Sequence, residues 1–103
     1  MAPIGWFGGA YHRPMTQLLT AAEVREAMFS KPQIGKRGYH EDDVDEFLDE
    51  VVARLEGRGD LTAEEVRDAR FRKPPWGKRG YNEADVDALL DRVAATLDVL
   101  AQR

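Results

Sequence analysis

The sequence predicts an all-α protein in which two tandem helix-loop-helix repeats pack as a small bundle. The first observation is an internal duplication: residues 19–55 match residues 61–97 without a gap, and roughly two thirds of the paired positions are identical. The second is a helix-start signal at two places in each copy. The third is a basic loop, rich in glycine and proline, that separates those two places. Each repeat is therefore expected to contain a short helix, this loop and a longer amphipathic helix.

The chain is expected to divide into an arm, two repeats and a linker, at residues 1–18 (N-terminal arm), 19–56 (repeat 1), 57–60 (linker) and 61–103 (repeat 2). Glycine and proline in the arm oppose a regular helix. The arm nevertheless contains more large apolar side chains than is usual for a free tail, namely Trp6, Phe7 and Tyr11. Three interpretations stay open: a poorly ordered arm, an arm packed over the core, and a docking arm for a membrane or a protein partner.

The composition is that of a globular domain, with 33% charged residues, 43% hydrophobic residues and a net charge of −4. The acidic balance argues against nucleic-acid binding driven by overall charge. The chain contains no cysteine, so it has neither a disulfide framework nor a thiolate metal site, which suits a reducing cytoplasm. No apolar run approaches the length of a membrane span, and the N-terminus lacks the features of a signal peptide. We therefore expect a cytoplasmic protein.

The short helix of each repeat begins with a capping box, in which a threonine hydroxyl and a glutamate carboxylate satisfy free backbone amides of the first turn. The box pairs Thr20 with Glu23 in repeat 1 and Thr62 with Glu65 in repeat 2. We expect about ten helical residues from each start, because a proline shortly afterwards bars continuation of the helix.

The longer helix is expected at about residues 40–56 in repeat 1 and 82–102 in repeat 2. Asn82 is a good N-cap for it, and His40 is a weaker substitute. Acidic residues crowd the first turns, where they complement the positive end of the helix dipole. Apolar residues spaced three and four apart predict a coiled-coil-like seam at Val44, Leu48, Val51, Leu55, Val86, Leu90, Val93 and Leu97.

The seam must be buried, either against the other repeat or against a second chain. Parallel pairing of the two long helices requires the chain to return about 20 Å between them. The linker alone reaches at most ~14 Å. The short helix of repeat 2 supplies some further return path, so parallel pairing is strained but stays open. We expect a helical bundle and favour dimerisation.

The loop sequences carry a family resemblance. Residues 29–39 read FSKPQIGKRGY, and residues 71–81 read FRKPPWGKRGY. Both resemble the N-terminal domain of DivIVA proteins, and the second is most similar to actinobacterial members. A typical DivIVA protein carries one such domain and then a long parallel coiled coil, whereas a second copy of the domain stands here in its place. The chain thus resembles tandem-repeat proteins of the DivIVA family.

The resemblance implies a scaffold that binds curved membrane at the cell pole or division site and recruits partners. It also implies that the loops present an apolar and a basic side chain to the bilayer. By motif position, the candidates for membrane or partner binding are Ile34, Lys36, Arg37, Trp76, Lys78 and Arg79.

The residues of the loops leave several uses open. Seven of the 15 basic residues lie in the two loops, directly before acidic helix starts. They can pair with neighbouring carboxylates, bind an anionic membrane surface or bind a protein partner. The acidic helices that flank the loops argue against nucleic acid.

No catalytic, cofactor-binding or metal-binding residue is predicted. The acidic residues from Asp42 to Asp49 lack matched histidine or cysteine ligands, and they are interpreted as a solvated helix face. No nucleophile is found with a base beside it, so the protein is not expected to be an enzyme.

Two functional hypotheses follow. The first is a non-enzymatic adaptor or scaffold of DivIVA-like type, whose partner is another copy, a larger protein complex or the inner membrane surface. The second is a small accessory subunit of a larger enzyme complex, docked through the aromatic arm and the helical seams. No cofactor is expected in either case.

Overall fold

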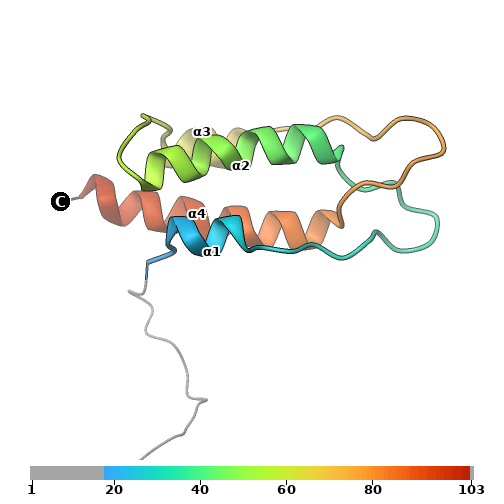
Figure 1. Ribbon diagram of the computed structural model, residues 1–103, viewed down its shortest axis with the longest axis horizontal. Helices are drawn as coiled ribbons and strands as arrows, with labels where there is room; N and C mark the ends of the chain where they lie inside the picture. Colours follow the sequence, from blue (N-terminus) through green and yellow to red (C-terminus); the bar gives the residue numbers. More distant parts are fainter. Residues whose placement is uncertain (1–17, 103) are drawn as a thin grey trace, which may run out of the picture.

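The computed structural model describes residues 18–102, and residues 1–17 and 103 lie outside the described part of the chain. Within residues 18–102 the regular elements are helices: α1 (Ala21–Arg25), α2 (Glu41–Leu55), α3 (Ala63–Asp68) and α4 (Glu83–Ala101). Each repeat contributes a short helix, a long loop and a long helix (Figure 1). The predicted all-α fold is confirmed.

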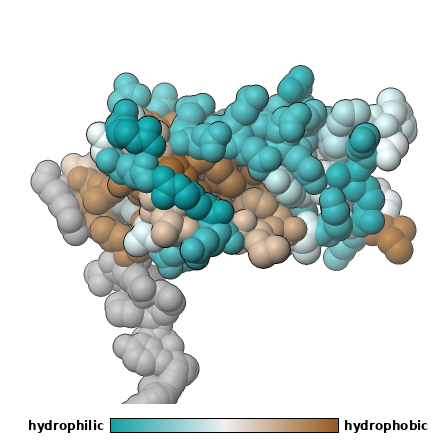
Figure 2. All heavy atoms as spheres, viewed as in Figure 1, coloured by the Kyte–Doolittle hydropathy of each residue, from teal (hydrophilic) through white to brown (hydrophobic). Residues whose placement is uncertain are grey.

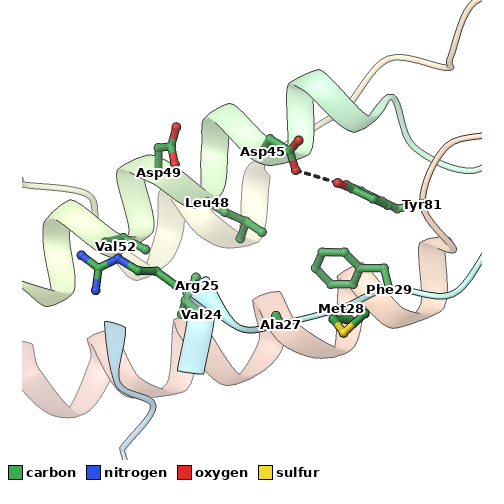
Figure 3. A pocket seen from close by; sticks show the side chains of 10 residues that line it. All are labelled: Val24, Arg25, Ala27, Met28, Phe29, Asp45, Leu48, Asp49, Val52 and Tyr81. Atoms are coloured by element: carbon green, nitrogen blue, oxygen red, sulfur yellow. Dashed lines mark hydrogen bonds between the residues drawn. The ribbon is translucent and has the colours of Figure 1, made fainter. Parts of the chain in front are cut away.

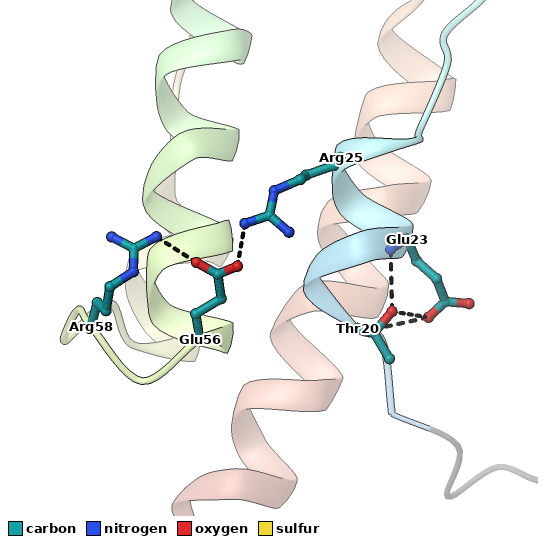
Figure 4. A network of polar contacts seen from close by, with 5 residues as sticks. All are labelled: Thr20, Glu23, Arg25, Glu56 and Arg58. Carbon is teal, nitrogen blue, oxygen red and sulfur yellow. Dashed lines mark hydrogen bonds and ion pairs between the residues drawn. The ribbon is translucent and has the colours of Figure 1, made fainter.

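Both short helices begin at the predicted capping boxes. The Thr20 hydroxyl accepts a hydrogen bond from the backbone N–H of Glu23 at 3.2 Å, and the Glu23 carboxylate accepts one from the N–H of Thr20 at 2.9 Å (Figure 4). Thr62 and Glu65 form the same pair of bonds at 3.1 and 3.0 Å. Two amides that the first turn would leave unpaired are thus satisfied in each repeat.

The short helices end earlier than the sequence predicts, so the expectation of ten residues is wrong. Helix α1 has 5 residues and α3 has 6. The chain beyond each helix is extended, and its carbonyls bind the other repeat: Ser30 O accepts from the N–H of Asn82 at 2.9 Å, and Arg72 O accepts from the N–H of His40 at 2.8 Å. An extended residue advances about 3.3 Å but a helical one only about 1.5 Å, so the extended form is what lets these carbonyls reach the other repeat.

The long helices begin and end close to the predicted residues. At the start of α2, His40 Nδ1 accepts a hydrogen bond from the N–H of Asp42 at 3.1 Å. At the start of α4, the side-chain oxygen of Asn82 accepts one from the N–H of Asp85, also at 3.1 Å. Both predicted N-caps are confirmed, the histidine included.

Helices α2 and α4 run parallel to each other (Figure 1). The linker only carries the chain from the end of α2 to the start of α3. Helix α3 and the extended segment at 69–80 then return along the length of the molecule to the start of α4. The strain expected for parallel pairing is therefore absent, because the shortened helix leaves an extended segment that covers the distance.

The core lies along the two long helices, and the short helices cover it. Helix α1 packs on α2, and α3 packs on α4. The valines of the predicted seam have no exposed surface at all: Val44, Val51, Val86 and Val93. The leucines differ between the repeats, because Leu90 and Leu97 are buried whereas Leu48 and Leu55 are half-buried. Much of the seam is thus buried within one chain.

Matching positions of the two repeats make matching contacts. The Thr96 hydroxyl of repeat 2 accepts from the N–H of Leu19 at 3.1 Å, and Arg54, at the equivalent position of repeat 1, donates to the carbonyl of Leu61 at 3.0 Å. Each long helix therefore holds the start of the other repeat's short helix, which indicates an approximate two-fold relation between the repeats.

Ion pairs join each short helix to the end of the long helix in its own repeat. Arg25 pairs with Glu56, which also accepts from Arg58 at 2.5 Å (Figure 4). At the equivalent positions of repeat 2, Arg67 pairs with Asp98 at 2.5 Å. These side chains are exposed, so the pairs orient the helices and contribute little stability.

Candidate functional site

The two loops cross at one end of the molecule, beyond the starts of α2 and α4 (Figure 1). Tyr39 and Tyr81 exchange backbone hydrogen bonds in an antiparallel bridge, with both N···O distances at 2.9 Å. The N–H of Gly80 donates to the carbonyl of Arg37 at 2.8 Å. The backbones of two segments 42 residues apart in sequence are therefore in direct contact, and we call this contact the crossing.

Two glycines make the crossing sterically possible. A Cβ atom at Gly80 would collide with the backbone of Tyr39, and one at Gly38 would collide with the backbone carbonyl of Tyr81. Gly38 also has a φ of 78°, a conformation that side chains with a Cβ rarely adopt. Both glycines are buried. The sequence predicts a turn at these glycines but not the close approach of two chains.

Aromatic and acidic side chains surround the crossing and join the repeats. The hydroxyl of Tyr39 donates to Asp87 at 2.8 Å, and that of Tyr81 donates to Asp45 at 2.8 Å. The Tyr81 ring lies 4.9 Å from that of Phe29, and the equivalent contact between Tyr39 and Phe71 is 5.1 Å. Such ring pairs contribute about 0.5–1.5 kcal/mol each beyond the area that they bury.

The half-buried tyrosines Tyr39 and Tyr81 predict that the protein loses stability at high pH. Burial, aided by the hydrogen bond to an aspartate, raises the pKa of both Tyr39 and Tyr81 to about 12, whereas the pKa of an unfolded tyrosine is about 10. Because the folded pKa is the higher one, the stabilisation is fully present below pH ~10 and is lost as the pH rises through about 12.

We expect the Tm, measured by circular dichroism, to fall between these two pH values. A variant with Tyr39→Phe and Tyr81→Phe removes the titrating hydroxyls, so its Tm should fall less over the same interval. Equal falls in both proteins would show that the two tyrosines do not cause the effect.

A second set of contacts fixes the long helices to the opposite loops. Asp43 accepts from the Arg72 guanidinium at 2.7 and 3.0 Å and from the Arg72 N–H at 2.9 Å, and these bonds hold the pKa of Asp43 well below its usual range. At the equivalent place, Asp85 accepts from the Ser30 hydroxyl at 2.6 Å and from its N–H at 2.9 Å, which lowers the pKa of Asp85. Sequence reasoning missed both pairs because each joins residues of different repeats.

Four of the six predicted loop residues project from the loops. Ile34 is 99% exposed and Trp76 is 90% exposed, values that are exceptional for large apolar side chains. Lys36 and Lys78 are exposed near them. Figure 2 shows apolar atoms protruding at this end of the molecule. We call Ile34, Lys36, Trp76 and Lys78 the loop tips.

The two predicted arginines reach across to the opposite loop. Arg37 donates to the carbonyl of Pro74, and Arg79 donates to the carbonyl of Pro32. The Arg37 guanidinium also lies 5.1 Å from the centre of the Trp76 ring, within range of a cation–π contact. These two arginines therefore brace the loops, while Lys36, Lys78 and Arg79 remain exposed to solvent.

The remaining predicted site residues lie elsewhere. The seam residues are buried or half-buried along α2 and α4 and belong to the core, not to the exposed loop tips. The arm residues Trp6, Phe7 and Tyr11 lie outside the described part of the chain. Within residues 18–102, no cluster of three metal-ligating side chains occurs. None of the described helices combines the length and apolarity needed to cross a bilayer.

Part of the chain is similar to the cell wall synthesis protein Wag31 of Mycobacterium tuberculosis, Mycobacterium leprae and Mycolicibacterium smegmatis. The identity is 53% over 47 residues, which covers 42% of this chain but only 18% of the first two relatives and 17% of the third. The chain thus spans less than a fifth of the length of these relatives. The similarity supports the DivIVA-like resemblance over that segment only. No family model and no solved structure matches the chain.

Proposed function

We propose that this chain is a non-enzymatic adaptor or scaffold of DivIVA-like type that attaches to the anionic inner surface of the membrane through its loop tips. The similarity to a cell wall synthesis protein favours action where the envelope is built, at the cell pole or division site. The observation that carries the proposal is the nearly complete exposure of Ile34 and Trp76 at the end of two interlocked loops.

Apolar insertion supplies one part of the attachment. Full burial of a large apolar side chain is worth about 1.5–3 kcal/mol. Tryptophan is well suited to the headgroup region, because its amphipathic ring is stable between water and hydrocarbon. The crossing and the two arginine braces hold the tips in place before binding, so little conformational freedom is lost on contact.

Charge supplies the other part and sets the orientation. Each lysine near an anionic surface adds roughly 1 kcal/mol, and Lys36 and Lys78 stand beside the apolar tips. The chain as a whole carries a net charge of −4, so its acidic helices are repelled by the same surface. The loop end is therefore the end that approaches the membrane.

These contributions add up to weak and reversible binding, which suits an adaptor. Two inserted side chains and two lysines give modest membrane affinity, because stable anchoring requires strong signals such as two lipid chains. Attachment of the long helices to a partner that itself lies at the membrane would multiply the affinity without new lipid contacts.

The proposal is tested by co-sedimentation with vesicles of phosphatidylglycerol and phosphatidylcholine, compared with vesicles of phosphatidylcholine alone. We expect binding to the anionic vesicles only, and a decrease in affinity as salt is added. Replacement of Ile34 or Trp76 by serine should each weaken binding about 30-fold, from a loss of ~2 kcal/mol.

The matched control is Gln33→Ser, which shortens an exposed polar side chain directly before Ile34 and leaves the loop tips unchanged. It should bind vesicles as the unaltered chain does. If all three variants bind equally well, or if neutral vesicles bind as tightly as anionic ones, the proposed attachment through the tips is wrong.

A further inference from the structure

A groove on the surface of repeat 1 is open and apolar. It lies between α1 with its following segment and the middle of α2, and it has a volume of about 580 Å³. Val24 and Phe29 line it from one side, and Leu48 and Val52 line it from α2 (Figure 3). Met28 lies at its edge with 91% of its surface exposed. Figure 2 shows apolar atoms between two rows of polar ones on this face.

Repeat 2 carries a groove at the equivalent place, and the comparison shows what is particular to the first. The second groove is smaller, at about 410 Å³, and Arg70 stands where repeat 1 has Met28. Asp45 and Asp49 border the first groove with Arg25 as the only cation that lines it. The second groove has two arginines against two aspartates. The first groove is therefore larger, more apolar and more acidic.

We infer that the groove of repeat 1 receives the N-terminal segment of the same chain, residues 1–17. This segment contains the bulky side chains Ile4, Trp6, Phe7 and Tyr11. It contains no aspartate or glutamate, and Arg13 gives it a positive charge. An aromatic, basic segment is complementary to an apolar groove with an acidic edge.

The attachment point allows the segment to reach the groove. The segment joins the described chain at Leu18, directly before α1, and α1 itself forms one wall of the groove. The eight residues from Tyr11 to Leu18 span up to about 27 Å when extended, so the aromatic side chains of the segment can reach back to that wall. Only repeat 1 is preceded by such a segment, and only repeat 1 has methionine in place of arginine at the groove edge.

The tether favours this occupant over a second copy of the chain. A segment joined to its site by a short linker has an effective concentration in the millimolar range. A second molecule at micromolar concentration would have to bind far more tightly to compete. The inference is independent of the proposed membrane attachment, which involves the opposite end of repeat 1.

The test uses the fluorescence of Trp6 in the 103-residue chain with Trp76→Phe, which leaves Trp6 as the single tryptophan of these residues. We expect a blue-shifted emission maximum and a severalfold lower acrylamide quenching constant than for free indole. Adding Met28→Arg should return both values toward those of a solvent-exposed tryptophan. That change gives the first groove the residue that the second already has, so the fold should tolerate it.

The matched control is Arg70→Met, which alters the second groove and should leave the Trp6 emission unchanged. A solvent-exposed Trp6 in the chain with Met28 intact would overturn the inference, as would an emission that Met28→Arg does not change. A blue shift that disappears on dilution would overturn it too, because it would identify a second copy as the occupant.

Discussion

Replacing Gly80 with alanine is expected to destabilise the protein more than any other change of a single methyl group. The added Cβ would collide with backbone atoms of Tyr39, which have no freedom to rotate away. Relief of this clash requires the loops to separate, with loss of the hydrogen bonds between Tyr39 and Tyr81. We expect a loss of at least ~3 kcal/mol, the upper end of what overpacking causes.

The loss is measured as the change in free energy of unfolding in urea, followed by circular dichroism. Gly59→Ala serves as the control, because a Cβ there meets its nearest neighbour at 3.5 Å, an ordinary contact distance. The control should stay within about 0.5 kcal/mol of the unaltered chain. If Gly80→Ala is as stable as Gly59→Ala, the loops do not cross in solution as they do here.

Replacing Leu97 with alanine is expected to have the second largest effect. Leu97 is 2% exposed and belongs to the core along α4. Its truncation removes apolar contacts and leaves a cavity, which together cost about 2–5 kcal/mol at buried leucines. The same urea titration measures the effect, and a shift of the midpoint with an unchanged slope is expected.

The matched comparison is Leu55→Ala, at the equivalent position of repeat 1. Leu55 is half-buried, so its truncation removes less buried apolar surface. We expect the free energy of unfolding to fall by only about 1 kcal/mol. Equal losses at the two positions would contradict the difference in burial between the repeats.

The features that the sequence predicted correctly depend on neighbours along the chain. A capping box is formed by residues three apart, so Thr20 with Glu23 and Thr62 with Glu65 are recognisable before any fold is known. The seam is likewise a periodicity within one helix, and its four valines are fully buried.

The features that it did not predict depend on the other repeat. The short helices end early because the carbonyls of Ser30 and Arg72 bind amides of the opposite long helix. The role of Gly80 depends in the same way on the position of Tyr39. Such contacts join residues 32 to 52 positions apart, and no local pattern encodes them.

The loop residues were predicted only in part for a similar reason. Exposure of Ile34 and Trp76 agrees with their motif position, but Arg37 and Arg79 look equivalent to the lysines beside them in sequence. Only the crossing brings a proline carbonyl of the opposite loop within reach of each guanidinium. The hydrogen bonds that these two arginines make across the crossing could therefore not be predicted from the loop sequence, and their part in binding stays a prediction.

The placement of both repeats on one chain changes the kinetic order of their association from second order to first order. The two halves meet as parts of one molecule, so their association is a first-order step whose equilibrium does not depend on protein concentration. Two separate halves with the same contacts would come apart on dilution, as dimers do. Duplication thus gives a cell a loop end that stays assembled even when only a few copies of the protein are present.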